Sequence, residues 1–226
     1  MENKEGYIVS VWKRPDWTSN DIIKYLKPFI RPLKVGHAGT LDPFAEGVLV
    51  VCTGKMTKKV SMIMEMEKEY LVDIVLGKRT DTLDSTGKIT AIKKCPPLNS
   101  KKIAKVLDQF IGEIDQIPPM FSALKHKGKR MYSLARKGIK IKQNPRKIII
   151  HSIELLSYKD NFISIKVICG KGTYIRSLAR DIGHKLNTEG YVDSLIRSRV
   201  GSFDRLASIS AEDLKLWLQS QQHIKN

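Results

Sequence analysis

The stretch GHAGTLDPFAEGVLVVC, residues 36–52, contains a single Asp-Pro pair directly before a short apolar run. An Asp before Pro is most often a turn residue, because Pro favours an extended backbone there and the carboxylate caps nearby amides. Here the apolar run predicts a buried strand over residues 47–52, so Asp42 would project from a loop held at the edge of the core. Such loops often carry catalytic groups, which makes Asp42 a candidate for catalysis.

Other kinds of chemistry fit this stretch less well. A metal site would need more ligands than the nearby His37 and Glu46. Hydrolysis by paired carboxylates needs a second acid, and Glu46 leaves that alternative open. The glycines and Lys55 do not have the spacing of an ATP phosphate loop, and Met56 stands where Ser or Thr is required. The cysteines are far apart and show neither disulfide nor zinc spacing: Cys52, Cys95 and Cys169.

The charge balance indicates a polyanionic partner. The chain has 226 residues, with 40 Lys and Arg against 23 Asp and Glu, and a formal net charge of +17. The basic residues are spread over several segments, which favours RNA or DNA over the alternative of a merely lysine-rich surface. No apolar run approaches the roughly 18–20 residues of a membrane span. We therefore expect a cytoplasmic protein without a membrane partner.

The hydrophobic patterns predict an α+β protein. Besides 47–52, strands are expected at 7–13, 70–76, 87–93 and 194–203, with two or three more within 146–170. Helices are expected at 18–30, 99–112, 172–186 and 210–219, and the first and last begin with capping boxes. Strands outnumber helices and alternate with them irregularly, which predicts a mixed, mostly antiparallel central sheet flanked by helices. The length favours one domain over residues 1–226.

The stretch around Asp42 resembles the signature of the TruB family of tRNA pseudouridine synthases, which is close to G-H-x-G-T-L-D-P-x-A-x-G-V-L. KRPDWTSND resembles the family's K-P-x-G-x-T-S-x-D, and KEYLVDIVLGKRTDTLDSTG its K-x-Y strand followed by T-D-T-x-D-x-x-G. QIPPMFSALK resembles Q-x-P-P-x-Y-S-A-x-K, and GTYIRSLARDIG and LIRSRVGSF match the last two blocks. The resemblance covers roughly residues 7–205, nearly the whole chain.

This resemblance implies a pseudouridine synthase fold and an isomerisation without cofactor or metal. Such enzymes break the N-glycosidic bond of the T-loop uridine of tRNA, uridine 55, rotate the flipped-out uracil and rejoin it to the ribose through carbon 5. It implies that Asp42 is the catalytic carboxylate and that Arg176 pairs with it. Tyr70 would pack on the target base and act in proton transfer at carbon 5. Attack by Asp42 as a nucleophile and removal of a sugar proton both remain open.

The resemblance also implies RNA contacts. His37 would enter the RNA loop near the flipped base, Leu195 would line the uracil pocket, and Lys13 would lie near the site. Residues 117–147 would form a thumb that closes over the tRNA T-arm stem-loop; its basic residues, which lie among aromatic ones, include Lys125, Lys129 and Arg130. We expect a monomer without the PUA-type RNA-binding domain that follows in many bacterial members.

Two other functions remain as alternatives. The positive charge and the thumb-like segment also suit a non-catalytic module that binds RNA or helps tRNA to fold. A synthase acting on a different RNA would keep the chemistry and change the substrate.

Overall fold

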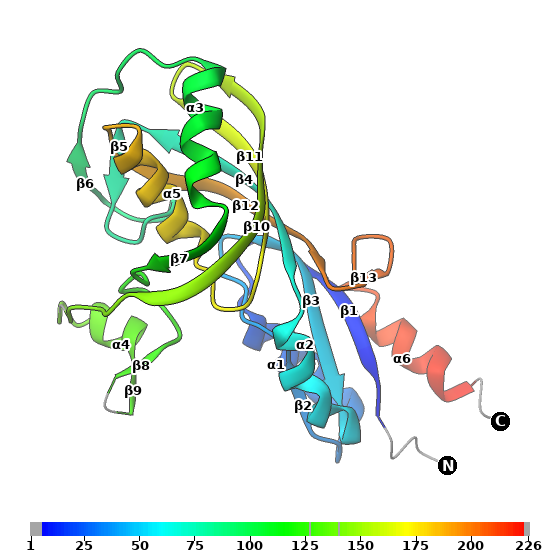
Figure 1. The fold of residues 1–226 in the computed structure, drawn as a ribbon. Coiled ribbons are helices and arrows are strands. Elements are labelled where there is room, and N and C mark those ends of the chain that lie inside the picture. The colour runs from blue at the N-terminus through cyan, green and yellow to red at the C-terminus, as the bar shows by residue number, and fades with distance from the viewer. Residues whose placement is uncertain (1–5, 127, 140, 224–226) are drawn as a thin grey trace. The chain divides into compact units, whose positions relative to one another are not determined.

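The computed structural model describes residues 6–126, 128–139 and 141–223, and the chain forms two compact units (Figure 1). Unit 1 contains the chain up to Tyr70 together with the residues from Ile196 onward. Unit 2 contains Leu71–Leu195. The chain passes from one unit to the other within strand β4 (Lys68–Leu76) and again within β12 (Gly190–Val200).

Unit 1 is built on a mixed group of strands in the order β13-β1-β3-β12, and β2 also pairs with β3. β1 is antiparallel to β3 and parallel to β13, and β3 is parallel to β12. The bounds of the strands not yet given are β1 Ile8–Lys13, β2 Val35–His37, β3 Glu46–Thr53 and β13 Ser208–Ser210.

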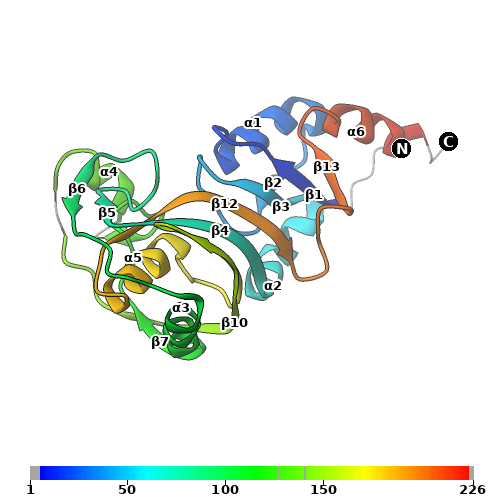
Figure 2. The same cartoon turned by 90° about the horizontal axis from the view of Figure 1, so that it is seen from above.

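Helices cover both faces of β3. α1 (Ser19–Ile30) and α6 (Leu214–His223) pack with Leu49 and Val51, and Figure 2 shows these two helices close together. The other face, with Val48 and Val50, packs against α2 (Val60–Glu65), which follows the 3-10 helix η1 (Gly54–Lys59). Because both faces are covered, the strand is apolar along its length rather than alternating.

In unit 2 the strand order is β12-β4-β11-β10-β7. β10 (Arg146–Lys159) is antiparallel to β11 (Phe162–Cys169) and to β7 (Gly112–Gln116). Helix α3 (Ser100–Leu107), which continues as η2 (Asp108–Phe110), lies beside β10 in Figure 1 and also contacts α5 (Ile175–Lys185). A small hairpin pairs β5 (Lys78–Thr80) with β6 (Ile89–Ile92).

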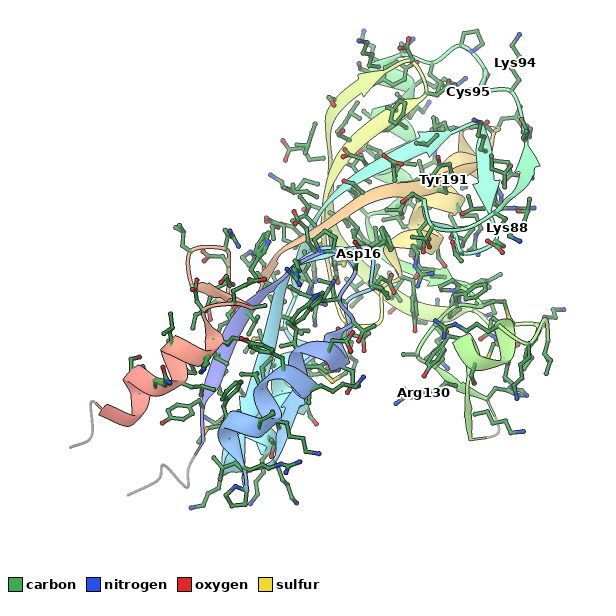
Figure 3. All side chains as sticks on the ribbon, turned by 180° about the vertical axis from the view of Figure 1, so that it is seen from behind. Asp16, Lys88, Lys94, Cys95, Arg130 and Tyr191 are labelled. Atoms are coloured by element: carbon green, nitrogen blue, oxygen red, sulfur yellow. The ribbon has the colours of Figure 1, made fainter. Side chains whose placement is uncertain are left out.

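The segment predicted as a thumb, also in unit 2, holds a short hairpin and a short helix. β8 (Lys125–His126) pairs with β9 (Lys129–Arg130), and α4 (Met131–Ala135) follows directly. The amide of Met131 donates to the carbonyl of Leu124 at 2.8 Å, which ties the start of α4 to the chain before the hairpin. Figure 3 labels Arg130 at this hairpin.

The predicted α+β class with a mostly antiparallel sheet and flanking helices is confirmed. The predicted strands and helices are all present, whereas eight short elements were not predicted: β2, β5, β7, β8, β9, β13, α2 and α4. These elements are only two to six residues long, so a period of two or 3.6 residues hardly repeats within them. Among the helices described, none is long and apolar enough to cross a membrane.

Candidate active site

The loop that carries Asp42 is fixed through its backbone. Ser19, the first residue of α1, accepts a hydrogen bond from the amide of Leu41 at 2.9 Å and donates to the carbonyl of the same residue at 3.2 Å. On the other side of Asp42, the amide of Asp16 donates to the carbonyl of Pro43 at 2.9 Å. Asp42 itself is half-buried in this fixed loop.

A buried arginine holds the same loop from β12. The guanidinium of Arg197 donates from Nε to the carbonyl of Val48 at 2.7 Å, and from its two terminal nitrogens to the carbonyls of Thr40 and Gly39 at 3.3 and 3.2 Å. Arg197 is only 1% exposed. Sequence reasoning missed this residue, because its acceptors lie 149–158 positions earlier in the chain and no local pattern connects them.

Lys13 also binds this loop. Its ammonium group donates to the carbonyls of Arg14 at 2.8 Å, Trp17 at 2.7 Å and Pro43 at 3.2 Å, and the residue is fully buried. Burial, and next the positive charge of Arg197, lower the pKa of Lys13 to about 8, while the charge of Asp42 acts in the opposite direction. The charge of Asp42 thus acts on Lys13, whose ammonium donates to backbone carbonyls.

His37 lies on β2, at the start of the same loop. Burial, and next the charge of Arg197, lower the pKa of His37 below its usual value, which favours the neutral imidazole at pH 7. Its Nδ1 atom is buried and has no hydrogen-bond partner among the residues that the structure describes. A backbone hydrogen bond with Gly39 acts on the pKa of His37 in the opposite direction.

Tyr70 belongs to unit 1, as do Asp42, Lys13 and His37. It is 8% exposed and lies on β4. The preceding residue, Glu69, accepts a hydrogen bond from the hydroxyl of Ser198 on β12 at 2.8 Å. This contact fixes the part of β4 from which Tyr70 projects.

Arg176 is buried in unit 2, in the first turn of α5. It donates to the carbonyls of Thr82 and Phe121, both at 2.8 Å, and forms an ion pair with Asp84 at 3.4 Å. Asp84 also accepts hydrogen bonds from the hydroxyls of Thr82 at 2.7 Å and Thr86 at 2.6 Å. Arg176 thus joins three of the motifs seen in the sequence: TDTLD, PPMFS and GTYIR.

Further bonds fix the segment around Arg176. The Gln116 side chain donates to the carbonyl of Tyr174 at 3.1 Å and accepts from its amide at 2.8 Å. Ser177 donates to the carbonyl of Ile117 at 2.8 Å. Sequence reasoning missed Asp84, although the T-D-T-x-D motif contained the signal. Asp42 and Arg176 belong to different units, and their pairing stays a prediction.

The remaining predicted residues are also in unit 2. Leu195 is buried on β12, at 5% exposure. Lys129 and Arg130 are exposed on β9, where Arg130 donates to the carbonyl of Ala123 at 2.8 Å. Lys125 begins β8, and its side chain lies outside the described part of the structure.

Unit 1 carries a lysine surface that was not predicted. Its members are exposed and lie around η1 and the start of β2: Lys34, Lys55, Lys58 and Lys59. The amide of Gly54 donates to the carbonyl of Lys34 at 2.8 Å, which brings the two segments together. Residues 22–41 and 47–64 contain no Asp or Glu, so this surface suits an anionic partner. Within the described ranges, no group of three or more His, Cys, Asp or Glu residues could hold a metal ion.

Comparison with solved structures identifies the fold. The chain superposes on a chain of a Cbf5–Nop10–Gar1 complex with a TM-score of 0.74 and 27% identity, over 99% of this chain and 57% of that one. It also superposes on a chain of an H/ACA RNP bound to a substrate RNA containing 2'-deoxyuridine, with a TM-score of 0.70 and 25% identity, and spans 56% of that chain. The fold is that of the pseudouridine synthases.

Sequence comparison gives the family. Residues 27–175 match the model of the TruB family pseudouridylate synthase (N terminal domain). The chain is 44% identical to tRNA pseudouridine synthase B of Caldanaerobacter subterraneus, over 92% of this chain and 73% of the relative. It is 41% identical to the protein of the same name from Phocaeicola vulgatus, over 98% of this chain and 97% of the relative. The chain belongs to the TruB family, as its motifs predicted.

Proposed function

We propose that this protein converts the T-loop uridine of tRNA, uridine 55, into pseudouridine, with Asp42 as the catalytic carboxylate. Relatives that match nearly the whole chain are named tRNA pseudouridine synthase B. The observation that carries the proposal is the fixed loop around Asp42. Three side chains from separate segments, Lys13, Ser19 and Arg197, bind its backbone on both sides of Asp42.

A fixed carboxylate suits this reaction because the reacting atoms must stay aligned while the uracil is detached. The bond between carbon 1' of the ribose and nitrogen 1 of uracil breaks, the uracil rotates, and a bond from carbon 1' to carbon 5 forms. The proton on carbon 5 is then lost and nitrogen 1 takes up a proton, so that the product is an isomer of the substrate. Asp42 either attacks the ribose and is later displaced by carbon 5, or takes a proton from the sugar and returns it. The same carboxylate serves both routes.

The other site residues act around the uracil. Tyr70 packs on the base and takes part in the proton transfer at carbon 5, and Leu195 lines the uracil pocket. Arg176, held by Asp84 and two carbonyls, pairs with Asp42 during the reaction. Lys13 contributes by holding the loop, because its ammonium is engaged with three carbonyls.

The partner is the T-arm stem-loop of tRNA, bound by a monomer. The uridine must leave its stack to reach Asp42, and His37, on β2 at the start of the same loop, would enter the space next to it. The lysine surface beside β2 and the exposed Lys129 and Arg130 of the thumb supply cations for the RNA backbone. The net charge of +17 acts in the same direction.

Mapping of pseudouridine in cells that lack the protein tests this function. Total RNA would be treated with carbodiimide and read by reverse transcription, after complementation with the wild type or with Asp42→Asn. We expect the stop at the T-loop uridine of tRNA to be lost in the deletion strain and restored by the wild type alone. Loss of a stop in another RNA would assign another substrate, and no lost stop would favour the RNA-binding alternative.

A further inference from the structure

The guanidinium of Arg14 lies over an aromatic ring in unit 1. Its guanidinium carbon is 4.6 Å from the centre of the Trp17 ring. Trp17 contacts Tyr25 edge-on at 6.0 Å between ring centres, and Tyr25 contacts Phe29 at 5.9 Å, so aromatic residues of α1 pack against the indole. The guanidinium therefore has Trp17 on one side, while 55% of the Arg14 side chain is exposed.

This pair lies beside the catalytic loop. Trp17 sits between Asp16, whose amide binds the carbonyl of Pro43, and Ser19, whose hydroxyl binds Leu41. The segment around Trp17 is thus bonded to the residues on both sides of Asp42. Asp16, labelled in Figure 3, has a φ of 66° and stands where K-P-x-G-x-T-S-x-D has its glycine.

We propose that Arg14, supported by Trp17, forms a stacking platform for an unpaired base of the RNA next to the target uridine. The proposal rests on the proposed function, because it takes an RNA loop as the ligand. Unpaired bases of RNA loops stack on aromatic rings and on arginine guanidinium planes. A guanidinium already stacked on an indole is held in one orientation and keeps its second face open.

The ion pair of Arg14 favours a base over a phosphate. The Nη1 atom of Arg14 lies 3.1 Å from the carboxylate of Glu212, and both side chains are more than half exposed. This contact occupies an edge of the guanidinium, where a phosphate would bind, and places a negative charge beside it. The face opposite Trp17 is not used by the ion pair, and a flat base fits that face.

Arg14→Lys distinguishes stacking of a base from attraction of a phosphate, because lysine keeps the positive charge and loses the planar face. We expect the KM for a T-arm RNA to rise about five- to tenfold, which is the scale of one base-stacking contact, with kcat nearly unchanged. Arg205→Lys is the matched control, since Arg205 lies 4.2 Å over the ring of Trp12 in the same unit. This control should leave both constants as in the wild type. A KM for Arg14→Lys equal to that of the wild type would overturn the proposal.

RNAs that lack one loop base at a time identify the stacked base. The wild type and Arg14→Lys would be compared on each abasic RNA. At one position next to the target, removal of the base should raise the KM for the wild type and leave that of Arg14→Lys unchanged. Equal effects on both proteins at every position would overturn the proposal. A wild type that makes no pseudouridine would instead refute the proposed function, so the two failures are distinguishable.

Discussion

Replacement of Arg197 by lysine removes the planar guanidinium that binds the Asp42 loop and keeps the positive charge. A lysine ammonium replaces a planar group that donates one bond at 2.7 Å and two at 3.2–3.3 Å. Hydrogen bonds from charged groups contribute about 1.5–3 kcal/mol each. If the two longer bonds are lost at the lower end of this range, the free energy of unfolding falls by about 3 kcal/mol. The free energy of unfolding of a typical domain is about 5–15 kcal/mol, so the variant should still fold.

The effect on catalysis should be larger than the effect on RNA binding. The carbonyls of Gly39 and Thr40 would lose their donor, and the loop that presents Asp42 would shift. A displacement of about 1 Å can reduce a rate roughly 100-fold. We therefore expect kcat for pseudouridine formation to fall by about that factor, with the RNA dissociation constant nearly unchanged. Urea unfolding, tritium release and filter binding measure the three quantities.

A second variant, Arg197→Met, separates the role of Arg197 in holding the loop from the effect of its positive charge. The charge of Arg197 lowers the pKa of His37. Removing this charge should raise that pKa, as followed by NMR of the imidazole, whereas Arg197→Lys should change it little. Arg199→Lys is the control on the same strand, where Arg199 pairs with Glu67 at 2.7 Å. A kcat for Arg197→Lys close to that of the wild type would refute the positioning role.

Three further predictions concern stability. Asp84→Asn leaves Arg176 charged and buried without its carboxylate partner, so the free energy of unfolding should fall by about 3–5 kcal/mol. The double variant Asp84→Asn with Arg176→Met should recover part of this loss. Urea unfolding measures both, and no recovery would contradict the pairing of Arg176 with Asp84. The pKa of Lys13 is about 8 in the folded protein and 10.5 in the unfolded chain. Between pH 8 and pH 10.5 the unfolded chain therefore binds more protons than the folded protein. The stability of the wild type relative to Lys13→Met should thus rise by about 3 kcal/mol from pH 8 to pH 10.5, and a flat difference would contradict the burial. Gly47→Ala should cost about 3 kcal/mol, because φ is 119° and a Cβ would lie 2.2 Å from the carbonyl oxygen of Arg197, whereas Gly112→Ala meets open space at a φ of 99°. Equal losses of stability in the two alanine variants would show that the close approach is not the cause.

Elements with local signals were predicted correctly. The capping box of Thr18 and Asp21 precedes α1, and both of its reciprocal bonds are present. Ser210 and Asp213 form the corresponding contact before α6. The bounds of α1 follow from this cap and from apolar residues at helical spacing, which are properties of neighbouring residues.

The contacts that build the site could not be predicted in this way. In the sequence, Arg176 is an arginine in the first turn of a helix, which usually lies at the surface. In the structure it is buried, because carbonyls from two distant segments and Asp84 surround it. The contacts of Arg197 could be predicted even less, since all its hydrogen-bond acceptors come from residues 39–48, far away in the sequence. Periodicity specifies which face of an element is buried, whereas these contacts depend on how distant segments meet.

Tritium release from tRNA labelled at carbon 5 of uracil tests the central claim most directly. Isomerisation at the T-loop uridine must free the hydrogen on carbon 5, so the wild type should release a stoichiometric amount of tritium from that position. Asp42→Asn should bind the same tRNA with unchanged affinity, unfold at the same temperature and release none. Release by Asp42→Asn at the wild-type rate would contradict the role of the carboxylate.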